Sequence, residues 1–515
     1  MVRSFLHFAL ALCLGLGAGL WAEDSATAPA APDAPAATMS DVDKKIAAAK
    51  SWFGYVIEEK EVEKDGKKVK EMVESVPAAF NNGDNAWMLI SAAIVLMMTV
   101  PGLALFYGGL VRRKNVLGTM MHSYILTGVV AILWTIFGFA VAFGGASPYW
   151  GGLNEFVMLK DVAHNAALAF NGDGTRFPIS TDYAPTISFA IFCMFQLMFA
   201  VITPALISGA FAERIKFSGM LIFTVIWFCC CYLPLAHMVW GKNGLFNWGF
   251  GANDWAAFDF AGGTVVHISS GVAALMCAIV LGKRKGYPER SMTPHSLVLS
   301  AIGAGLLWVG WFGFNAGSAL GANGLAALAF TNTMIAAGAA ALTWPMAEWL
   351  IRGKPTMLGC ISGAVAGLVA ITPACGFVEP GSALIIGLIA GALCFAAVSY
   401  LKKALGYDDA LDAFGIHGIG GIFGAIATGI FLSVDANPNI AALNGDLYKE
   451  IVAETQPVVF NQIKAVGVTV LLSAVVALVA LLIAKFTVGL RPTAEQEEEG
   501  LDVTQHGEEG YGQAN

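Results

Sequence analysis

The strongest constraint on this 515-residue chain is a series of eleven apolar segments, each long enough to cross a lipid bilayer and separated by short loops. Backbone groups inside a bilayer must be hydrogen-bonded internally, which favours helices. The sequence therefore predicts an all-α polytopic membrane protein. The expected spans run at about 86–108, 119–143, 186–210, 217–240, 260–281, 296–316, 324–350, 356–373, 381–401, 412–433 and 461–488.

The composition agrees with this class of protein. Hydrophobic residues make up 57% of the chain and charged residues only 13%, far from the average of soluble domains. The formal net charge of −8 is carried by loops, an N-terminal segment and an acidic tail, so nucleic-acid binding has no support. The nine cysteines lie almost entirely in apolar runs without metal-ligand spacing, which predicts small core residues.

The chain begins with features typical of a secretory signal peptide. One arginine precedes an apolar run that ends in small residues, and cleavage is expected after Ala22. Residues 23–85 are rich first in Ala and Pro and then in mixed charges. We interpret them as a solvated extracytoplasmic extension, either a tether or a short surface helix.

The distribution of positive charge predicts the orientation. Eleven crossings (86–490) from an outer N-terminus place the C-terminus (491–515) inside. The expected inner loops carry clusters such as Arg112–Lys114, Lys283–Lys285 and Lys402–Lys403, whereas the outer loops between spans carry only four basic residues. This asymmetry obeys the positive-inside rule and predicts a multi-pass protein of the inner (cytoplasmic) membrane.

Two histidines suggest internal duplication. His267 lies in the fifth expected span and His417 in the tenth, and each opens a glycine-spaced run, "HISSG" and "HGIGG". Many transporters consist of inverted repeats with their sites near the midplane. We therefore expect two inverted five-helix halves followed by one final helix.

Burying an imidazole in a bilayer is expensive, so such a residue commonly marks a functional site. One buried histidine could equally be a hydrogen-bonded core residue, but two at matching positions favour a shared function. Burial without a carboxylate partner favours neutral rings. A heme or metal site competes poorly, because no Cys, Asp or Glu stands at ligand spacing. We expect no cofactor.

Ten short motifs together resemble a known family. They are "PGLALFYGGLVRRKNVL", "AERIKFS", "AHMVWG", "DFAGGTVVHI", "GWFGFNAGS", "ALAFTNT", "GKPTMLG", "ITPACG", "FGIHG" and "EGLDVTQHGE". From about residue 85 onward the chain resembles a bacterial member of the ammonium transporter family (Amt/Mep/Rh). The resemblance implies a non-enzymatic homotrimer with one pore through each eleven-helix subunit, and ammonium and methylammonium as substrates.

The resemblance also implies an outer ammonium site. Trp240 would attract the cation through its ring, an interaction of about 0.5–2 kcal/mol. Phe199 and Phe314 would form a stacked gate below it, and Ser318 would accept a hydrogen bond from the ion. Phe195, four residues before Phe199 on the same helix face, would contact the pore. For the phenylalanines alone, core packing is the alternative interpretation.

Asp259 and Thr333 are expected to play supporting parts. Asp259 stands at the start of a helix, where a carboxylate caps backbone N–H groups. By resemblance it shapes the outer site and adds negative potential, and a plain N-cap is the alternative. Thr333, in "FTNT", would make a minor polar contact behind the pore.

The expected mechanism follows from the apolar lumen. Ammonium is a weak acid, and an apolar pore disfavours its charged form. Neutral ammonia would pass the gate and then His267 and His417, whose ring nitrogens can donate and accept protons. A membrane ammonium sensor on the same scaffold is the alternative, although about 25 tail residues are too few for an added signalling domain.

The acidic tail at 491–515 has two interpretations. It could be a disordered, solubilising end. The resemblance of "EGLDVTQHGE" implies instead that it packs on the inner face and contacts a PII-type signalling protein. Asp408, Asp409 and Asp412 would help to order it.

Overall fold

The computed structural model describes residues 55–64, 67–77, 81–162, 168–170, 176–178, 180, 182–249, 255–442 and 456–512. The expected signal peptide (1–22) and the greater part of the 23–85 extension lie outside these residues. The described chain is mainly helical. Two antiparallel hairpins join it: β1 (Tyr55–Lys64) with β2 (Lys67–Pro77), and β3 (Leu168–Phe170) with β4 (Arg176–Pro178).

The first hairpin corrects the expectation for the extension. A tether or surface helix was expected there, but residues 55–77 form a two-stranded hairpin. Its backbone register places Lys60 opposite Glu71 and Glu61 opposite Lys70. In the sequence, an Asp-Gly dipeptide (65–66) separates the two strands, and this dipeptide is a strong hairpin signal.

Ten helical segments among the described residues are long and apolar enough to cross a membrane. They are Asn82–Leu110, Arg113–Phe143, Phe189–Phe211, Phe217–Trp240, Gly263–Leu281, Leu297–Gly317, Gly324–Arg352, Pro380–Leu405, Phe414–Phe431 and Val458–Thr487. They correspond to ten of the eleven expected spans. The remaining one, expected at 356–373, corresponds to the shorter apolar helix α13 (Met357–Ile371).

Several of these segments combine α-helix with a short π-helical turn. The first five consist of α3 (Asn82–Met97), η1 (Met98–Leu103) and α4 (Ala104–Leu110); α5 (Val116–Leu133), η3 (Trp134–Gly138) and α6 (Phe139–Phe143); α7 (Phe189–Phe211); α8 (Phe217–Trp227), η5 (Phe228–Tyr232) and α9 (Leu233–Trp240); and η6 (Gly263–Ile268) and α10 (Ser269–Leu281). The later ones consist of α11 (Leu297–Gly317); α12 (Gly324–Arg352); α14 (Pro380–Ala396), η7 (Ala397–Leu401) and α15 (Lys402–Leu405); η8 (Phe414–Gly418) and α16 (Ile419–Phe431); and α18 (Gln456–Thr487). Short 3-10 turns are η2 (Arg113–Asn115), η4 (Val157–Leu159) and η9 (Pro438–Ala442), and the tail forms α19 (Ala494–Glu499) and η10 (Asp502–His506).

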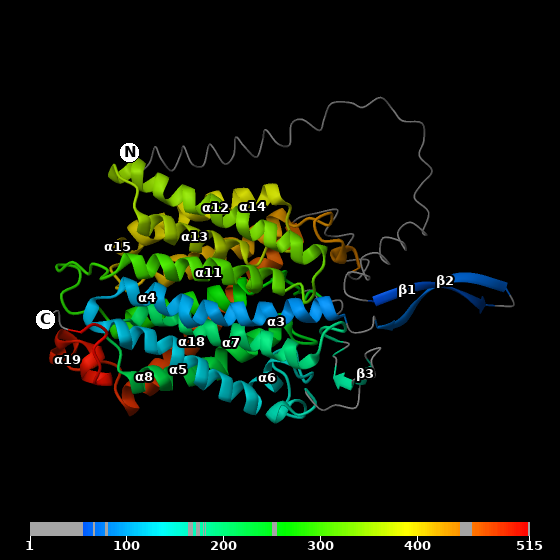
Figure 1. The fold of residues 1–515 in the computed structure, drawn as a ribbon, viewed down its shortest axis with the longest axis horizontal. Helices are drawn as coiled ribbons and strands as arrows, with labels where there is room; N and C mark the ends of the chain where they lie inside the picture. Colours follow the sequence, from blue (N-terminus) through cyan, green and yellow to red (C-terminus); the bar gives the residue numbers. More distant parts are fainter. Residues whose placement is uncertain are drawn as a thin grey trace.

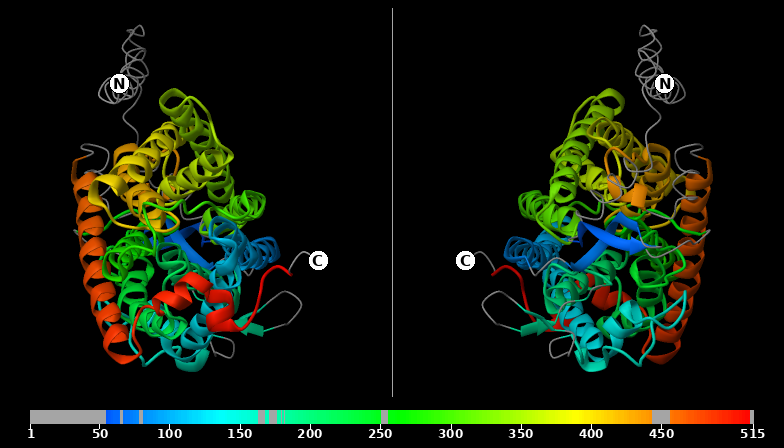
Figure 2. Two further views of the ribbon diagram at one scale, coloured as in Figure 1. Left: turned by 90° about the vertical axis from the view of Figure 1, so that its left-hand side faces the viewer. Right: turned by 90° about the vertical axis from the view of Figure 1, so that its right-hand side faces the viewer.

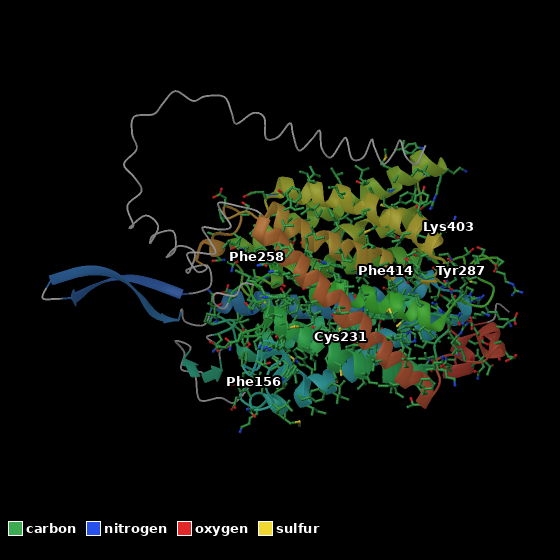
Figure 3. All side chains as sticks on the ribbon, turned by 180° about the vertical axis from the view of Figure 1, so that it is seen from behind. Phe156, Cys231, Phe258, Tyr287, Lys403 and Phe414 are labelled. Atoms are coloured by element: carbon green, nitrogen blue, oxygen red, sulfur yellow. The ribbon has the colours of Figure 1, made fainter. Side chains whose placement is uncertain are left out.

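The helices run side by side along the long axis of the molecule (Figure 1). The β1–β2 hairpin lies at one end of this bundle and α19 at the other. Seen along the bundle, the helices surround a central region, with α18 at the periphery (Figure 2). From behind, α18 crosses the bundle obliquely (Figure 3) and packs against α8, α10 and α16.

Burial separates central helices from peripheral ones. In α7 and in η6–α10, 78% of the residues in an 18-residue apolar stretch are buried inside the molecule. In α18 the corresponding share is 33%. The η6–α10 and η8–α16 segments pack on each other, α10 against η8 and α16 against η6. A side chain at Gly271 would collide with the backbone of Gly418, and one at Gly421 would press on His267. Glycine therefore permits this close helix contact.

A buried ion cluster joins four loops at the end of the bundle that carries the tail. The Arg284 guanidinium donates to Asp408 at 2.8 and 2.9 Å and to Glu213 at 3.1 Å, and Arg112 also donates to Glu213. Burial by itself would raise the pKa of both carboxyls. Hydrogen bonds from these guanidiniums outweigh burial and lower the pKa of Glu213 and of Asp408.

The tail is ordered against the loops at this end. The Asp502 carboxylate accepts hydrogen bonds from the backbone N–H groups of Leu117 and Gly118 at 3.0 and 2.8 Å, in the first turn of α5, where a carboxylate also complements the helix dipole. The Gln505 side chain accepts from the Phe217 N–H at 2.7 Å. Residues 491–512 are therefore a docked segment, and the interpretation of them as a disordered end is wrong.

The three aspartates expected to order the tail bond to other partners. Asp408 pairs with Arg284 in the ion cluster, and Asp412 pairs with Lys402 at 2.7 Å. Asp409 accepts from the backbone N–H of Phe414. These contacts fix the loop before η8.

Arg284→Met should lower the free energy of unfolding by about 3 kcal/mol, because Asp408 loses its buried partner. Thermal unfolding in detergent at pH 7 measures this loss. Since the folded pKa of each carboxyl is lowered, the pair's contribution is present above the unfolded pKa of about 4 and is lost as pH falls through the folded value. The wild type should therefore lose more stability in acid than the variant.

Arg290→Met is the matched control. Its side chain is 72% exposed and lies 3.7 Å from Glu498, so its loss should change stability by less than about 1 kcal/mol. Equal destabilisation by both substitutions would contradict the role given to the buried cluster.

Candidate functional site: an aromatic cavity above two histidines

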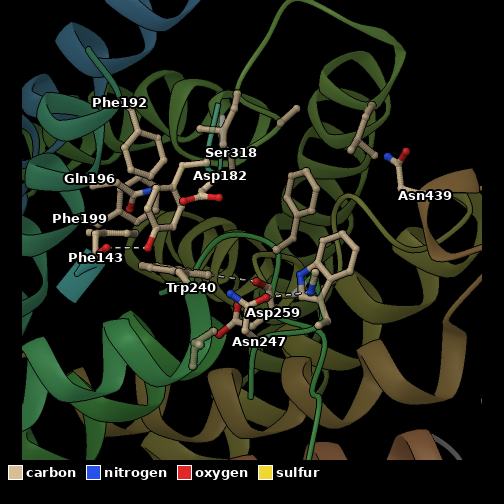
Figure 4. A pocket seen from close by; sticks show the side chains of 18 of the residues that line it. Phe143, Asp182, Phe192, Gln196, Phe199, Trp240, Asn247, Asp259, Ser318 and Asn439 are labelled. Atoms are coloured by element: carbon tan, nitrogen blue, oxygen red, sulfur yellow. Dashed lines mark hydrogen bonds between the residues drawn. The ribbon is translucent and has the colours of Figure 1, made fainter. Parts of the chain in front are cut away.

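A cavity of about 320 Å³ lies among the ends of α6, α7, α9 and α11. Aromatic and apolar side chains form most of its wall (Figure 4). Its polar side chains are Asp182, Gln196, Asn247, Asp259, Ser318 and Asn439. The cavity therefore combines aromatic faces with a few hydrogen-bonding groups, as small-ligand sites commonly do.

Trp240 forms part of this wall at the end of α9. Its indole N–H donates to the backbone carbonyl of Asp259 at 3.3 Å, and its ring meets Phe199 edge-on at 5.6 Å between centroids. These two contacts fix the orientation of the ring. The structure thus brings together Trp240, Phe199, Ser318 and Asp259, four of the five residues expected at the outer site.

Two stacked phenylalanines lie between the cavity and the buried interior. The rings of Phe199, on α7, and Phe314, on α11, are 4.1 Å apart at 30°. Phe199 lines the cavity, whereas Phe314 lies 6.1 Å from the His267 ring. Phe195 does not line the cavity. It packs 5.0 Å from Phe199 and against Gly317, so it supports the pair from behind.

Ser318 presents an oxygen to the cavity. Its hydroxyl donates to the Phe314 carbonyl at 2.8 Å, one turn earlier on α11. Because the hydroxyl proton is engaged there, the remaining lone pairs of the oxygen can accept from a ligand. A hydroxyl oxygen placed in this way favours a ligand that can donate an N–H hydrogen bond over one that cannot.

The Asp259 carboxylate is directed at the backbone of the following turn. One oxygen accepts from the N–H groups of Gly262 and Gly263, each at 2.7 Å. The other accepts from the N–H of Thr264 at 2.8 Å and from its hydroxyl. Gly262 has a φ of +112°, which favours glycine. Asp259 therefore caps η6, and its contribution to the cavity is its charge.

The two histidines face each other in the interior. His267 lies on η6 and His417 on η8, with their rings stacked at 5.4 Å and 18°. Their Nδ1 atoms are 3.3 Å apart, so one must donate and the other accept. The buried Nε2 of His267 has no hydrogen-bond partner within the described residues. The pair can therefore relay a proton between its rings.

The counterpart of Asp259 in the second histidine segment was not predicted from the sequence. Asp409 stands eight residues before His417, as Asp259 stands eight before His267, and its carboxylate accepts from the Phe414 N–H at 2.7 Å. Burial raises the pKa of Asp409 to about 6 against the opposing charge of Lys402. Equal spacing in the two segments was the signal available in the sequence.

Trp311 was also absent from the site residues predicted from the sequence. Its ring stacks on His267 at 5.4 Å and 19°, and its N–H donates to Thr372 at 2.9 Å. Trp311 lies three residues before Phe314 and therefore on the same face of α11, which was visible in the sequence. Thr333 accepts from Asn315 at 2.9 Å and lies behind α11, away from the cavity wall.

Comparison with known proteins identifies the family. A model of the Ammonium Transporter Family matches residues 86–511. The chain belongs to this family, and it is a multi-pass membrane protein. The ammonium transporter of Bacillus subtilis is 48% identical over 429 residues, which cover 83% of this chain and 98% of that protein.

Solved structures agree with this assignment. Mep2 of Candida albicans is similar with a TM-score of 0.69 and 31% identity, covering 81% of this chain and 88% of Mep2. A structure described as a sensor Amt protein has a TM-score of 0.71 and 27% identity, covering 82% of this chain and 98% of that one. The bundle of apolar helices in this ammonium transporter family member therefore has the fold of these solved structures.

Gly271→Val should separate η6–α10 from η8 and so pull the histidine rings apart. Overpacking of this kind costs about 1–3 kcal/mol, which detergent thermal unfolding measures. Gly338→Val, on α12, is the matched control, because nothing lies within 4 Å of a side chain added there. Equal stability of the two variants would contradict the close contact.

Proposed function

We propose that this protein transports ammonium, and methylammonium as its analogue, across the inner (cytoplasmic) membrane. The observation that carries the proposal is the order of groups along one path: an aromatic cavity, a stacked phenylalanine pair and a buried histidine pair. Membership of the ammonium transporter family and the 48% identity to the Bacillus subtilis transporter support it.

Recruitment takes place in the aromatic cavity. The faces of Trp240 and Phe199 attract a cation through their ring quadrupoles, by about 0.5–2 kcal/mol for a partly desolvated ion. Ser318 accepts an N–H hydrogen bond, which an alkali cation cannot provide. The Asp259 carboxylate adds negative potential without contacting the ion, since its oxygens are occupied by the backbone of η6.

Passage requires loss of a proton. The stacked rings of Phe199 and Phe314 present an apolar barrier in which the charged form of the substrate is disfavoured. Neutral ammonia passes between them and meets His267. The Nε2 of this ring has no hydrogen-bond partner among the residues that the structure describes, so it can form a hydrogen bond with ammonia. The proton given up by ammonium goes to water on the outer side of the phenylalanine pair. The Nδ1 contact to His417 provides a route by which a proton taken up by one histidine ring can pass to the other.

The same proposal includes the topology. Eleven spans, counting the short α13, form two inverted five-helix halves and a final helix α18, with the N-terminus outside and the C-terminus inside. The repeated spacing of Asp259 to His267 and of Asp409 to His417 supports the two halves. The hairpin at one end of the bundle and the docked tail at the other fit this orientation. Residues 1–22 act as signal peptide.

The assembly follows the family. Three subunits form a homotrimer in the lipid bilayer, each with its own pore. The docked tail, which bonds to the first turn of α5 and to the loop before α8, provides a surface for a PII-type signalling protein at the cytoplasmic face.

A membrane ammonium sensor is the second candidate function. The similarity to a structure described as a sensor Amt protein favours it. Such a protein would bind ammonium in the same cavity with little flux. The higher identity to transporters leads us to prefer transport.

His267→Ala should reduce methylammonium uptake into proteoliposomes by at least about tenfold, because the relay of protons loses a member. Radiolabelled methylammonium uptake at equal protein density measures the effect. His295→Ala is the matched control. Its ring bonds to the Val111 carbonyl and to Tyr511 at the tail, away from the pore, so uptake should stay within twofold of wild type.

Wild-type protein that binds methylammonium without uptake would favour the sensor. Uptake that survives in His267→Ala would contradict the histidine route while leaving transport itself intact.

A further inference from the structure

A second carboxylate stands in the wall of the outer cavity, and it is not one of the family motifs. Asp182 comes from the loop before α7 and lines the same cavity as Trp240 and Ser318. Figure 4 shows it among the lining side chains. Whereas the Asp259 carboxylate bonds to backbone N–H groups, the Asp182 carboxylate pairs with the Lys242 ammonium at 2.8 Å. Both side chains are close to half exposed, at 45% and 43%.

Neighbouring hydrogen bonds hold this pair at the cavity. The backbone N–H of Lys242 donates to the Tyr183 hydroxyl at 2.9 Å, and that hydroxyl donates to the Phe143 carbonyl at 2.7 Å. Tyr183 and Phe143 line the cavity as well. Lys242 also follows Trp240 by only two residues. The backbone on both sides of the ion pair is therefore anchored to the cavity wall.

We propose that Asp182 is an additional recruiting site for ammonium and that the Lys242 side chain is a tethered competitor of the substrate. The inference rests on the proposed function, which it extends outward from Trp240. A lysine head group and an ammonium ion are both compact cations with several N–H donors. A carboxylate that binds the first can therefore bind the second.

The exposure of the pair makes the exchange possible. Ion pairs in contact with solvent are weak, so Lys242 can leave Asp182 when free ammonium arrives. A carboxylate at the mouth of a cavity with low-dielectric walls also raises the local concentration of cations. This effect is screened by salt. Asp182 should therefore matter most at low ammonium and low ionic strength.

Two single variants and their combination test the exchange. Asp182→Asn should raise the KM for methylammonium uptake by about three- to fivefold at low ionic strength, with maximal uptake unchanged. Lys242→Met should lower the KM by about two- to threefold, because the competitor is gone. In the Asp182→Asn background, Lys242→Met should change the KM by less than about 1.5-fold, since there is no carboxylate left to compete for.

The matched control is Asp435→Asn. Asp435 is an exposed residue in the loop after α16 and does not line the cavity, so its loss should leave the KM unchanged. If the two side chains acted only through surface charge, their opposite effects on the KM would cancel, and the double variant would have the KM of the wild type. That cancellation, or an unchanged KM in Asp182→Asn, would overturn the proposal.

Equilibrium titration separates this inference from the proposed function. Ammonium chloride is titrated into each detergent-solubilised variant in a calorimeter, with choline chloride as the control for ionic strength. If the wild type binds ammonium without transporting it, the proposed transport function is wrong. The Asp182 proposal is then judged by the Kd for ammonium, which should be about three- to fivefold higher in Asp182→Asn than in the wild type. If the wild type neither binds nor transports, both fail. Transport with equal Kd and KM in Asp182→Asn overturns the recruiting site alone.

Discussion

The contact between the two glycine-containing segments η6–α10 and η8–α16 is the constraint on which the rest of the structure depends. Gly271 lies against the backbone of Gly418, and Gly421 against His267. This approach sets the two Nδ1 atoms 3.3 Å apart. Two buried imidazoles are expensive unless each can satisfy the other. The close backbone contact is what makes that mutual hydrogen bond possible.

Carboxylates hold the start of each histidine segment in place. Asp259 bonds to three backbone N–H groups ahead of His267, and Asp409 bonds to the Phe414 N–H ahead of His417. Helix starts inside or near a bilayer leave N–H groups that water cannot satisfy. The backbone carbonyl of Asp259 also accepts a hydrogen bond from the Trp240 indole N–H. One residue thus connects the histidine segment to the aromatic wall of the cavity.

Much of this arrangement could be predicted from the sequence, because long apolar runs and buried ionisable residues have few alternative explanations. The helical spans and the placement of His267 and His417 in packed helices follow from such patterns. The β1–β2 hairpin was not predicted, because the mixed charges of the extension favoured a solvated segment and the Asp-Gly dipeptide at 65–66 was given no weight. Asp409 was associated with the tail because its spacing to His417, which matches that of Asp259 to His267, was given no weight. Trp311 could have been found from its spacing to Phe314 on α11, whereas Asp182 becomes visible only when tertiary packing brings the loop before α7 beside the site.

The central claim is that an apolar barrier and a histidine pair admit neutral ammonia once ammonium has lost a proton, and reject a cation that has no proton to lose. Currents and fluxes across wild-type proteoliposomes, with ammonium and then potassium at equal concentration, test it most directly. The account predicts ammonium flux and no potassium current above that of empty liposomes. A potassium current comparable to the ammonium signal would mean that intact cations cross the barrier between Phe199 and Phe314, which contradicts it.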